Sequence, residues 1–245
     1  KQARDQDSGQ NELFGGMSDA PVESTSQALH YVELPDCSDD ERLSGEKETL
    51  GLYLTGHPIT RYEDALAQFI TSRIVDLNPS GESAVVVAGL IVAIRTMRTR
   101  RGDRMAFITL DDRSSRIEMA VFSDVYEQCR DLIAKDKLIV VRGEVSVDEY
   151  SGGYKISAKD IYDFDQALAI FAKKLVITID AGLMNELFVK SLQNILTPFC
   201  NGRCPVVIRY EGETASAPLV LGKNWRVNPT EGLLEQLKNL IEGDN

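Results

Sequence analysis

The sequence lacks the features that mark membrane and secreted proteins. It has no run of 18 apolar residues and no hydrophobic signal segment at its start, so we expect neither a membrane span nor export. Cysteines are few and scattered, which argues against a disulfide framework. They are Cys37, Cys129, Cys200 and Cys204. Cys200 and Cys204 have no second ligand pair nearby, so we expect reduced thiols in the cytosol rather than a zinc site.

The sequence also lacks the motifs of common enzymes. We find no phosphate-binding G-x-x-x-x-G-K-[ST], no G-x-S-x-G and no H-E-x-x-H, and neither His30 nor His57 has a catalytic motif around it. His57 precedes a proline, which is typical of a cap or turn residue. Asp111 and Asp112 resemble a metal-binding pair, but their place after a strand favours a turn. We predict no catalytic residue, metal or cofactor in this chain.

Acidic residues predominate, and their distribution is uneven. The net charge is −11. Residues 1–81 hold 6 Lys and Arg against 15 Asp and Glu, whereas residues 82–165 hold 13 against 15 and residues 166–245 hold 8 against 8. A chain this acidic should not bind nucleic acid over its whole surface. Any such binding must come from a local basic patch.

The first third of the chain is predicted to be a linker followed by helices. Residues 1–36 are rich in Gln, Ser, Asp, Glu and Gly without periodicity, and we interpret them as a flexible linker. Residues 37–81 have helical periodicity. Ser38 with Glu41, and Thr60 with Glu63, have the spacing of capping boxes that start helices.

Residues 82–165 have the pattern of a small barrel. Five β-rich runs are separated by turn residues, and an amphipathic helix at 123–135 lies between the third and the fourth. The predicted strands are 83–94, 105–112, 116–122, 137–147 and 154–162. Three strands, a helix and two strands is the order of an OB-fold, a five-stranded barrel.

Residues 166–245 are predicted to form a compact α+β unit. We expect strands at 174–180, 205–210 and 215–221 and helices at 183–196 and 228–241. Asn228 and Pro229 are expected to cap and begin the last helix. The whole chain is thus predicted to be of mixed α+β class, with a short helical segment before the barrel.

Arginines gather between the first two predicted strands, in RTMRTRRGDRM at 95–105. This is one of the loops with which OB-folds hold oligonucleotides, and arginines can neutralise phosphates while aromatic residues stack on bases. We consider Phe107, Phe122 and Tyr154 for stacking, although both phenylalanines are as well suited to a core. The candidate DNA-binding residues are Arg95, Arg98, Arg100, Arg101, Arg104, Arg116, Tyr154 and Lys155. The alternative is a solvated hairpin tip that prevents edge-to-edge aggregation.

The predicted linker contains the unusual apolar pair Leu13-Phe14 in GQNELFGG. Two apolar anchors and the amide of Gln10 are what a short linear motif needs to bind a pocket. Gln10, Leu13 and Phe14 resemble the bacterial sliding-clamp-binding motif. The alternative is an apolar pair that packs back on a folded domain.

Several further segments resemble one family. GEKETLGLYLTGHPI (45–59) resembles the end of the polymerase region in the alpha subunits of bacterial DNA polymerase III, which are C-family replicative polymerases. TLDDRSSRIE (109–118), SGGYKISAKDI (151–161) and NWRVNPTEGLLEQL (224–237) resemble later parts of the same family, in the same order. The resemblance covers essentially the whole chain and implies a C-terminal portion of such a subunit.

The resemblance implies a division of labour. Gln10, Leu13 and Phe14 would tether the polymerase to the sliding clamp (beta), the OB domain would bind single-stranded template DNA, and residues 166–245 would dock on the tau subunit of the clamp loader, with Trp225 and Arg226 as candidate contacts. Nucleotidyl transfer in this family uses Mg²⁺ and palm aspartates that are absent here, so the chain alone should be inactive. The other core subunits would bind elsewhere. The alternative is a free-standing OB-fold nucleic-acid-binding adaptor.

Overall fold

The structure is a computed structural model that describes residues 36–79, 84–149, 152–180, 182, 184–212 and 216–242. The chain divides into two units after Asp39, and the architecture below concerns the second unit. The predicted clamp-binding residues Gln10, Leu13 and Phe14 lie outside the described residues. No helix in the described part of the chain is long and apolar enough to cross a membrane.

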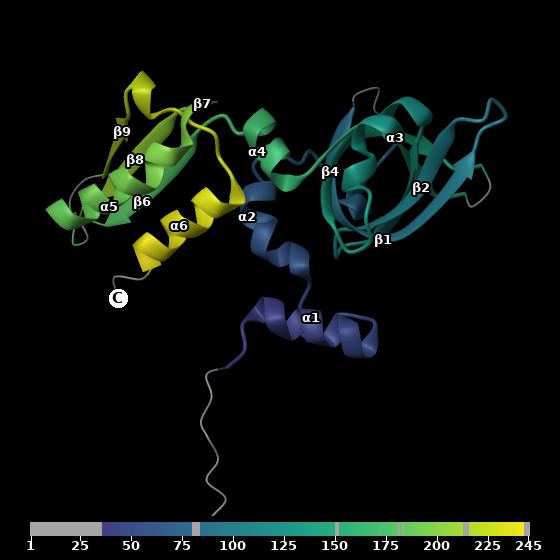
Figure 1. Cartoon of the computed structure of the whole chain (residues 1–245), viewed down its shortest axis with the longest axis horizontal. Helices are drawn as coiled ribbons and strands as arrows, with labels where there is room; N and C mark the ends of the chain where they lie inside the picture. Colours follow the sequence, from purple (N-terminus) through teal and green to yellow (C-terminus); the bar gives the residue numbers. More distant parts are fainter. Residues whose placement is uncertain are drawn as a thin grey trace, which may run out of the picture. The chain divides into compact units, whose positions relative to one another are not determined.

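Five strands form a closed barrel in the order β1-β2-β3-β5-β4. Their bounds are β1 Val85–Arg98, β2 Arg104–Asp111, β3 Arg116–Val121, β4 Leu138–Val147 and β5 Tyr154–Tyr162. Helix α3 (Ser123–Cys129) and a 3₁₀ turn (Arg130–Leu132) connect β3 to β4 (Figure 1). The β3–β5 pair is parallel and the other pairs are antiparallel. This arrangement confirms the predicted OB-fold.

Strand alternation fills the barrel interior. On β2, Ala106, Ile108 and Leu110 are fully buried, while the residues between them are only half-buried. Met119 on β3 and Ile156 on β5 are fully buried in the same core cluster. Because successive side chains on a strand point to opposite faces, one face of β2 builds the core and the other remains available for contacts, whereas β1 and β4 are buried on both faces over part of their length.

The arginine-rich segment is not the loop that the sequence predicted. Strand β1 continues to Arg98 and β2 begins at Arg104, with these two residues opposite each other. Only Thr99–Asp103 form the turn, in which Gly102 has a φ of 92°. Continued pairing satisfies backbone donors and acceptors that a loop would leave to water, and glycine permits the left-handed conformation at the tip.

Short helices precede the barrel: α1 (Asp39–Leu50), a 3₁₀ helix (Pro58–Tyr62), α2 (Glu63–Leu66) and a second 3₁₀ helix (Ile74–Asp76). The predicted capping box of Thr60 and Glu63 is wrong. The helix begins earlier, after His57, whose Nδ1 accepts a hydrogen bond from the Ile59 backbone N–H at 3.3 Å. The expectation that His57 is a cap residue is thereby confirmed.

After the barrel the chain forms a three-stranded sheet, β6-β8-β9, and three helices (Figure 1). The elements are α4 Phe164–Phe171, β6 Leu175–Asp180, α5 Glu186–Leu196, β7 Cys200–Cys204, β8 Val206–Glu211, β9 Ser216–Val220 and α6 Glu231–Glu242, with 3₁₀ turns at Thr197–Phe199 and Lys223–Trp225. Strand β6 is parallel to β8, and β9 is antiparallel to it. The predicted α+β class is confirmed.

Several boundaries in this region differ from the prediction. The sequence analysis missed α4, although Asp163 and Gln166 form a complete capping box at its start. The last helix begins at Glu231 rather than after Asn228. The Thr230 hydroxyl accepts the Leu233 N–H at 3.3 Å, whereas the Asn228 N–H donates to the Phe199 carbonyl at 2.9 Å. Thr230 rather than Asn228 therefore supplies the side-chain hydrogen bond at the start of α6, and Asn228 pairs through its backbone with another segment.

Strand β7 carries both Cys200 and Cys204 past the backbone of Val227. Between them, the Gly202 N–H donates to the Arg226 carbonyl at 3.1 Å, and a Cβ on Gly202 would overlap the Val227 backbone. Close approach of two backbones therefore requires glycine here. Cys204 packs in the core of this unit, where burial raises the pKa of its thiol.

Candidate nucleic-acid interface

The β1–β2 hairpin extends beyond the barrel as a two-stranded ribbon, which we define as residues 96–106. The β1–β4 pairing ends at Leu90 and the β2–β3 pairing ends at Ala106, whereas β1 and β2 remain paired to the tip. Figure 1 shows this hairpin projecting from the barrel strands. Because no third strand flanks its tip, side chains on both faces of the ribbon are accessible.

All four arginines of the ribbon lack an acidic partner among the described residues. Among the described residues, no carboxylate lies within 4.0 Å of the guanidinium groups of Arg98, Arg100, Arg101 or Arg104, and all four side chains are exposed. Most other arginines of the barrel are paired. Arg116, for example, donates through Nε to Asp111 at 2.7 Å. The ribbon therefore concentrates positive charge that the protein itself does not neutralise.

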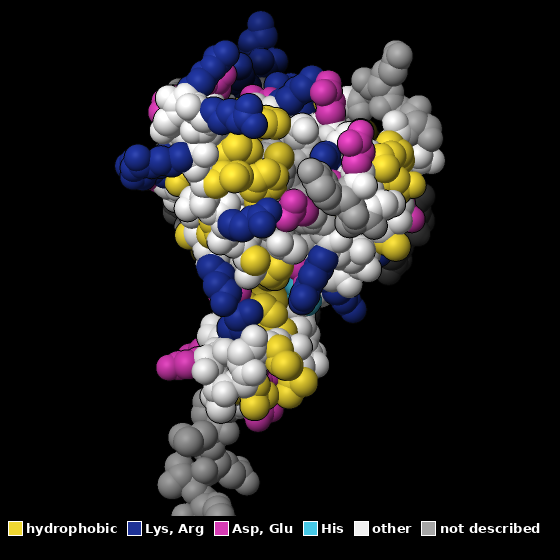
Figure 2. All heavy atoms as spheres, turned by 90° about the vertical axis from the view of Figure 1, so that its right-hand side faces the viewer, with side chains coloured by type: hydrophobic (Ala, Val, Ile, Leu, Met, Phe, Trp, Pro, Cys, Tyr) yellow, Lys and Arg dark blue, Asp and Glu magenta, His cyan; other side chains and the backbone are white. Residues whose placement is uncertain are grey.

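Strand register joins one face of the ribbon to the outer face of the barrel. Arg95 lies opposite Phe107, and Phe107 lies opposite Ala120. The Arg95 guanidinium lies 5.0 Å from the centre of the Phe107 ring and 3.8 Å from Glu118. Figure 2, in which the right-hand side of Figure 1 faces the viewer, shows hydrophobic side chains with Lys and Arg side chains around them.

The other candidates extend or border this face. Lys155 on β5 lies opposite Glu118 and pairs with Asp148 at 3.5 Å. Tyr154 is 45% exposed and could stack on a base, as could Phe122, which is 53% exposed. Phe107 is half-buried beneath Arg95. The register thus brings Arg95, Phe107 and Lys155 onto one surface, whereas Arg116 is held by Asp111.

The turn between β2 and β3 is a hydrogen-bonding centre. Asp112 accepts bonds from the backbone N–H groups of Ser114 (2.9 Å) and Ser115 (3.0 Å), as the turn interpretation predicted. Its other oxygen accepts the Ile74 N–H at 2.7 Å, and the Ser114 hydroxyl accepts the Val75 N–H at 3.3 Å. The turn therefore anchors the segment that precedes the barrel.

His57 joins the same turn, since its Nε2 lies 3.6 Å from Asp111. Burial lowers the pKa of His57, and Asp111 opposes this effect only in part. Burial also raises the pKa of Asp111, but hydrogen bonds from Arg116 and from the Arg113 N–H outweigh it and hold that pKa below its ordinary value. The structure thus favours a neutral imidazole beside an ionised carboxylate. The sequence indicated a turn but not this contact.

In the described residues, no three His, Cys, Asp or Glu side chains are grouped as a metal site would require. The described cysteines are free thiols. Cys129 is buried in the barrel core, and burial raises its pKa to about 11, so it is an unreactive thiol.

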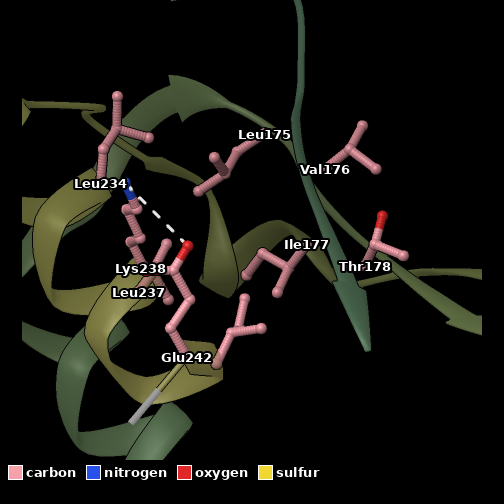
Figure 3. Close-up of a pocket in the computed structure, with 9 residues that line it drawn as sticks. Leu175, Val176, Ile177, Thr178, Leu234, Leu237, Lys238 and Glu242 are labelled. Carbon is pink, nitrogen blue, oxygen red and sulfur yellow. Dashed lines mark ion pairs between the residues drawn. The ribbon is translucent and has the colours of Figure 1, made fainter. Parts of the chain in front are cut away.

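The α+β part of the chain that follows the barrel, called the C-terminal unit below, has an apolar hollow of about 260 Å³ beside β6 and α6. Leu175 and Ile177 of β6 and Leu234 and Leu237 of α6 line it, and the Lys238–Glu242 ion pair lies at its border (Figure 3). The predicted contact residues are elsewhere, at the 3₁₀ turn before α6. Trp225 is partly buried against the core of this unit, and Arg226 is exposed.

The barrel matches a known class of domain. Residues 85–164 match the family model for the OB-fold nucleic acid binding domain. Among solved structures, a domain of replication protein A from Methanococcus maripaludis is 18% identical, with a TM-score of 0.32 over 38% of this chain and 93% of that chain. The mitochondrial single-stranded DNA binding protein Rim1 from S. cerevisiae is 16% identical, with a TM-score of 0.29 over 34% of this chain and 95% of that chain.

Comparison of the whole chain is more specific. Residues 191–241 match the model for the C-terminal domain of DNA polymerase III subunit alpha. The alpha subunit of Vibrio cholerae is 39% identical over 96% of this chain. That of Pseudomonas aeruginosa is 40% identical over 99%, and that of Escherichia coli K12 is 37% identical over 95%. In each case the match spans 20% of the relative's length. The chain therefore belongs to the DNA polymerase III alpha subunit family and corresponds to about a fifth of such a subunit.

Replacing His57 with Gln should flatten the pH dependence of stability. The folded protein lowers the pKa of His57 below its ordinary 6.5, so the folded state binds fewer protons there than the unfolded state. Stability from this group is full above the ordinary pKa and is lost as pH falls below it. Urea unfolding between about pH 7.5 and about pH 5 should show a steeper loss in the parent than in His57→Gln. Parallel curves for the two proteins would contradict this, and His30→Gln is the control.

Proposed function

We propose that this chain is a non-catalytic portion of a replicative DNA polymerase that works in the bacterial cytoplasm. It binds single-stranded template DNA through the barrel, tethers the polymerase to the sliding clamp and docks on the tau subunit of the clamp loader. The proposed DNA-binding role rests on one observation. The ribbon carries unpaired arginines, and it is continuous with the surface that carries Arg95 and Phe107. The match to alpha subunits over nearly the whole chain supports the rest, and a free-standing OB adaptor would leave residues 191–241 unexplained.

The chemistry of the ribbon suits a single strand. Guanidinium groups bind phosphates through strong, charge-assisted hydrogen bonds, and aromatic faces stack on unpaired bases without sequence preference. Arg100 and Arg101 at the tip can reach phosphates, and Phe107 with Met97 and Met105 offers an apolar surface for bases. The proposed contacts are Arg95, Arg98, Arg100, Arg101, Arg104, Arg116, Tyr154 and Lys155. Arg116 must leave Asp111 to contribute.

We assign polymerisation to the part of the alpha subunit that this chain does not span. Two-metal phosphoryl transfer with Mg²⁺ needs carboxylates clustered around the ions. The barrel's own acidic pair, Asp111 and Asp112, is occupied by the hydrogen bonds of the β2–β3 turn. The other core subunits of the polymerase would likewise bind outside this chain.

Replacing Arg100 and Arg101 with Ala should weaken binding to a single-stranded oligonucleotide and reduce its dependence on salt. Each lost phosphate contact lowers the slope of log affinity against log salt by about 0.7 for single strands, so the pair should lower it by about 1.4. Fluorescence anisotropy over a salt series measures both. The control Arg203→Ala with Arg209→Ala removes the same charge from exposed positions in the C-terminal unit. An unchanged slope in the first variant would make the ribbon a surface hairpin only.

A clamp tether is proposed for Gln10, Leu13 and Phe14. A linear motif joined to a DNA-binding domain gains effective concentration, so weak contact with a clamp on the same DNA can keep the polymerase attached between additions. This would turn a distributive enzyme into a processive one.

Calorimetric titration of the chain into the sliding clamp should show micromolar-range binding that the double variant Gln10→Ala, Phe14→Ala loses. These residues supply the amide and one apolar anchor of the motif. The double variant Asn11→Ala, Glu12→Ala alters the residues between them and should bind like the parent. Equal binding by all three proteins would locate the clamp contact elsewhere, and no binding by the parent would refute the tether.

Docking on tau is proposed for the surface around Trp225 and Arg226. Trp225 is held against the core, so a partner would meet its exposed edge and the neighbouring Arg226 rather than a free ring. Arg226→Ala should weaken binding to purified tau at least several-fold, since arginines near an interface centre often contribute more than 1 kcal/mol. The matched variant Arg209→Ala should not. Equal affinities in surface plasmon resonance would exclude Arg226 as a contact.

A further inference from the structure

The two faces of the β1–β2 ribbon differ in chemistry. One face carries Met97 and Met105, which lie opposite each other, and continues into Arg95 and Phe107. Alternation along the strands puts Thr96, Arg98 and Arg104 on the other face. Apolar and stacking groups therefore lie on the first face, and polar and cationic groups lie on the second.

The second face borders a cleft against α3. Two hollows of about 420 Å³ and about 660 Å³ share Arg104 and Tyr126 in their linings. The first is also lined by Thr96, Met97 and Arg98, and the second by Arg130 of the 3₁₀ turn that follows α3. Guanidinium groups from two separate elements thus face one cleft.

Charge and burial define what this cleft can hold. Asp103 and Glu127 also line it, so three arginines face two carboxylates. The nearest carboxylate to Arg130 among the described residues is that of Asp131, at 4.0 Å. Tyr126 is only 8% exposed, so its ring offers no platform for a base. The cleft suits phosphate groups, and its lining offers no exposed aromatic ring for stacking.

We propose that the ribbon binds a junction between single-stranded and duplex DNA, with the single strand on the Met97–Phe107 face and the duplex backbone in the Arg98–Arg104–Arg130 cleft. This inference rests on the proposed single-strand binding and extends it. Bases in a duplex are already stacked and paired, so a duplex presents mainly phosphates to a protein, whereas a single strand also presents base faces. Because the side chains of the two faces point to opposite sides of the ribbon, the ribbon would keep the two parts of the junction separate.

The variant Arg130→Ala tests this assignment, because Arg130 lines the cleft and is not among the proposed single-strand contacts. Anisotropy over a salt series would compare one oligonucleotide alone with the same oligonucleotide annealed to a shorter complement. The parent should bind the partial duplex more tightly than the single strand. In the variant this preference should shrink and the salt slope for the partial duplex should fall by about 0.9, because one lost duplex contact contributes about that much. Single-strand affinity should stay within about twofold.

Two further variants complete the test. Phe107→Leu keeps an apolar residue on the sheet face and should weaken binding to both DNAs, since both contain the single strand. Arg209→Ala, at an exposed position outside the barrel, controls for net charge. Equal loss for both DNAs in Arg130→Ala, or a parent without preference for the partial duplex, would overturn the junction while leaving single-strand binding intact. A parent that binds neither DNA would refute the proposed function itself.

Discussion

The parallel pairing of β3 with β5 closes the barrel. The arrangement of side chains on the outer surface of the barrel depends on that closure. Glu118, Met119 and Ala120 pair with Lys155, Ile156 and Ser157, and this contact leaves the barrel with no free edge at its waist. Each strand then has an interior face committed to the core and an exterior face that is free of it. Without closure, Phe107 and Lys155 would not belong to one surface.

Closure also explains why β1 and β2 can extend so far. Both strands are held by two neighbours within the barrel, and the extension adds backbone pairing at the cost of a single tight turn at Gly102. A ribbon anchored in this way holds its arginines on strands with defined faces. An equally basic but irregular loop would offer the same charge without separating a stacking face from a phosphate-binding face.

The sequence predicted the barrel well because the information was local. Val, Ile and alternating apolar residues marked all five strands, and β5 was placed at its observed bounds, 154–162. The ribbon was predicted as a loop instead of paired strands. Alternation of apolar and polar residues marks a strand only where one face is buried, and the arginines and Thr96 lie where both faces meet solvent. The cleft residue Arg130 was missed for a different reason, since its relation to Arg104 depends on how α3 packs against the barrel. The His57–Asp111 contact and the displacement of Asn228 from its cap are likewise products of tertiary pairing.

The isolation of the ribbon arginines within an acidic chain bears on how an encounter with DNA begins. A molecule of net charge −11 repels a polyanion on average, and this repulsion is long-ranged at low ionic strength. The ribbon is where that field is locally reversed. In the proposed complex with DNA, approach of this chain in most orientations would be unproductive, and the collisions that succeed would already have the hairpin directed at the strand. Selection of orientation before contact would spare that complex a slow rotational search, so the acidic remainder of the chain would guide its basic tip.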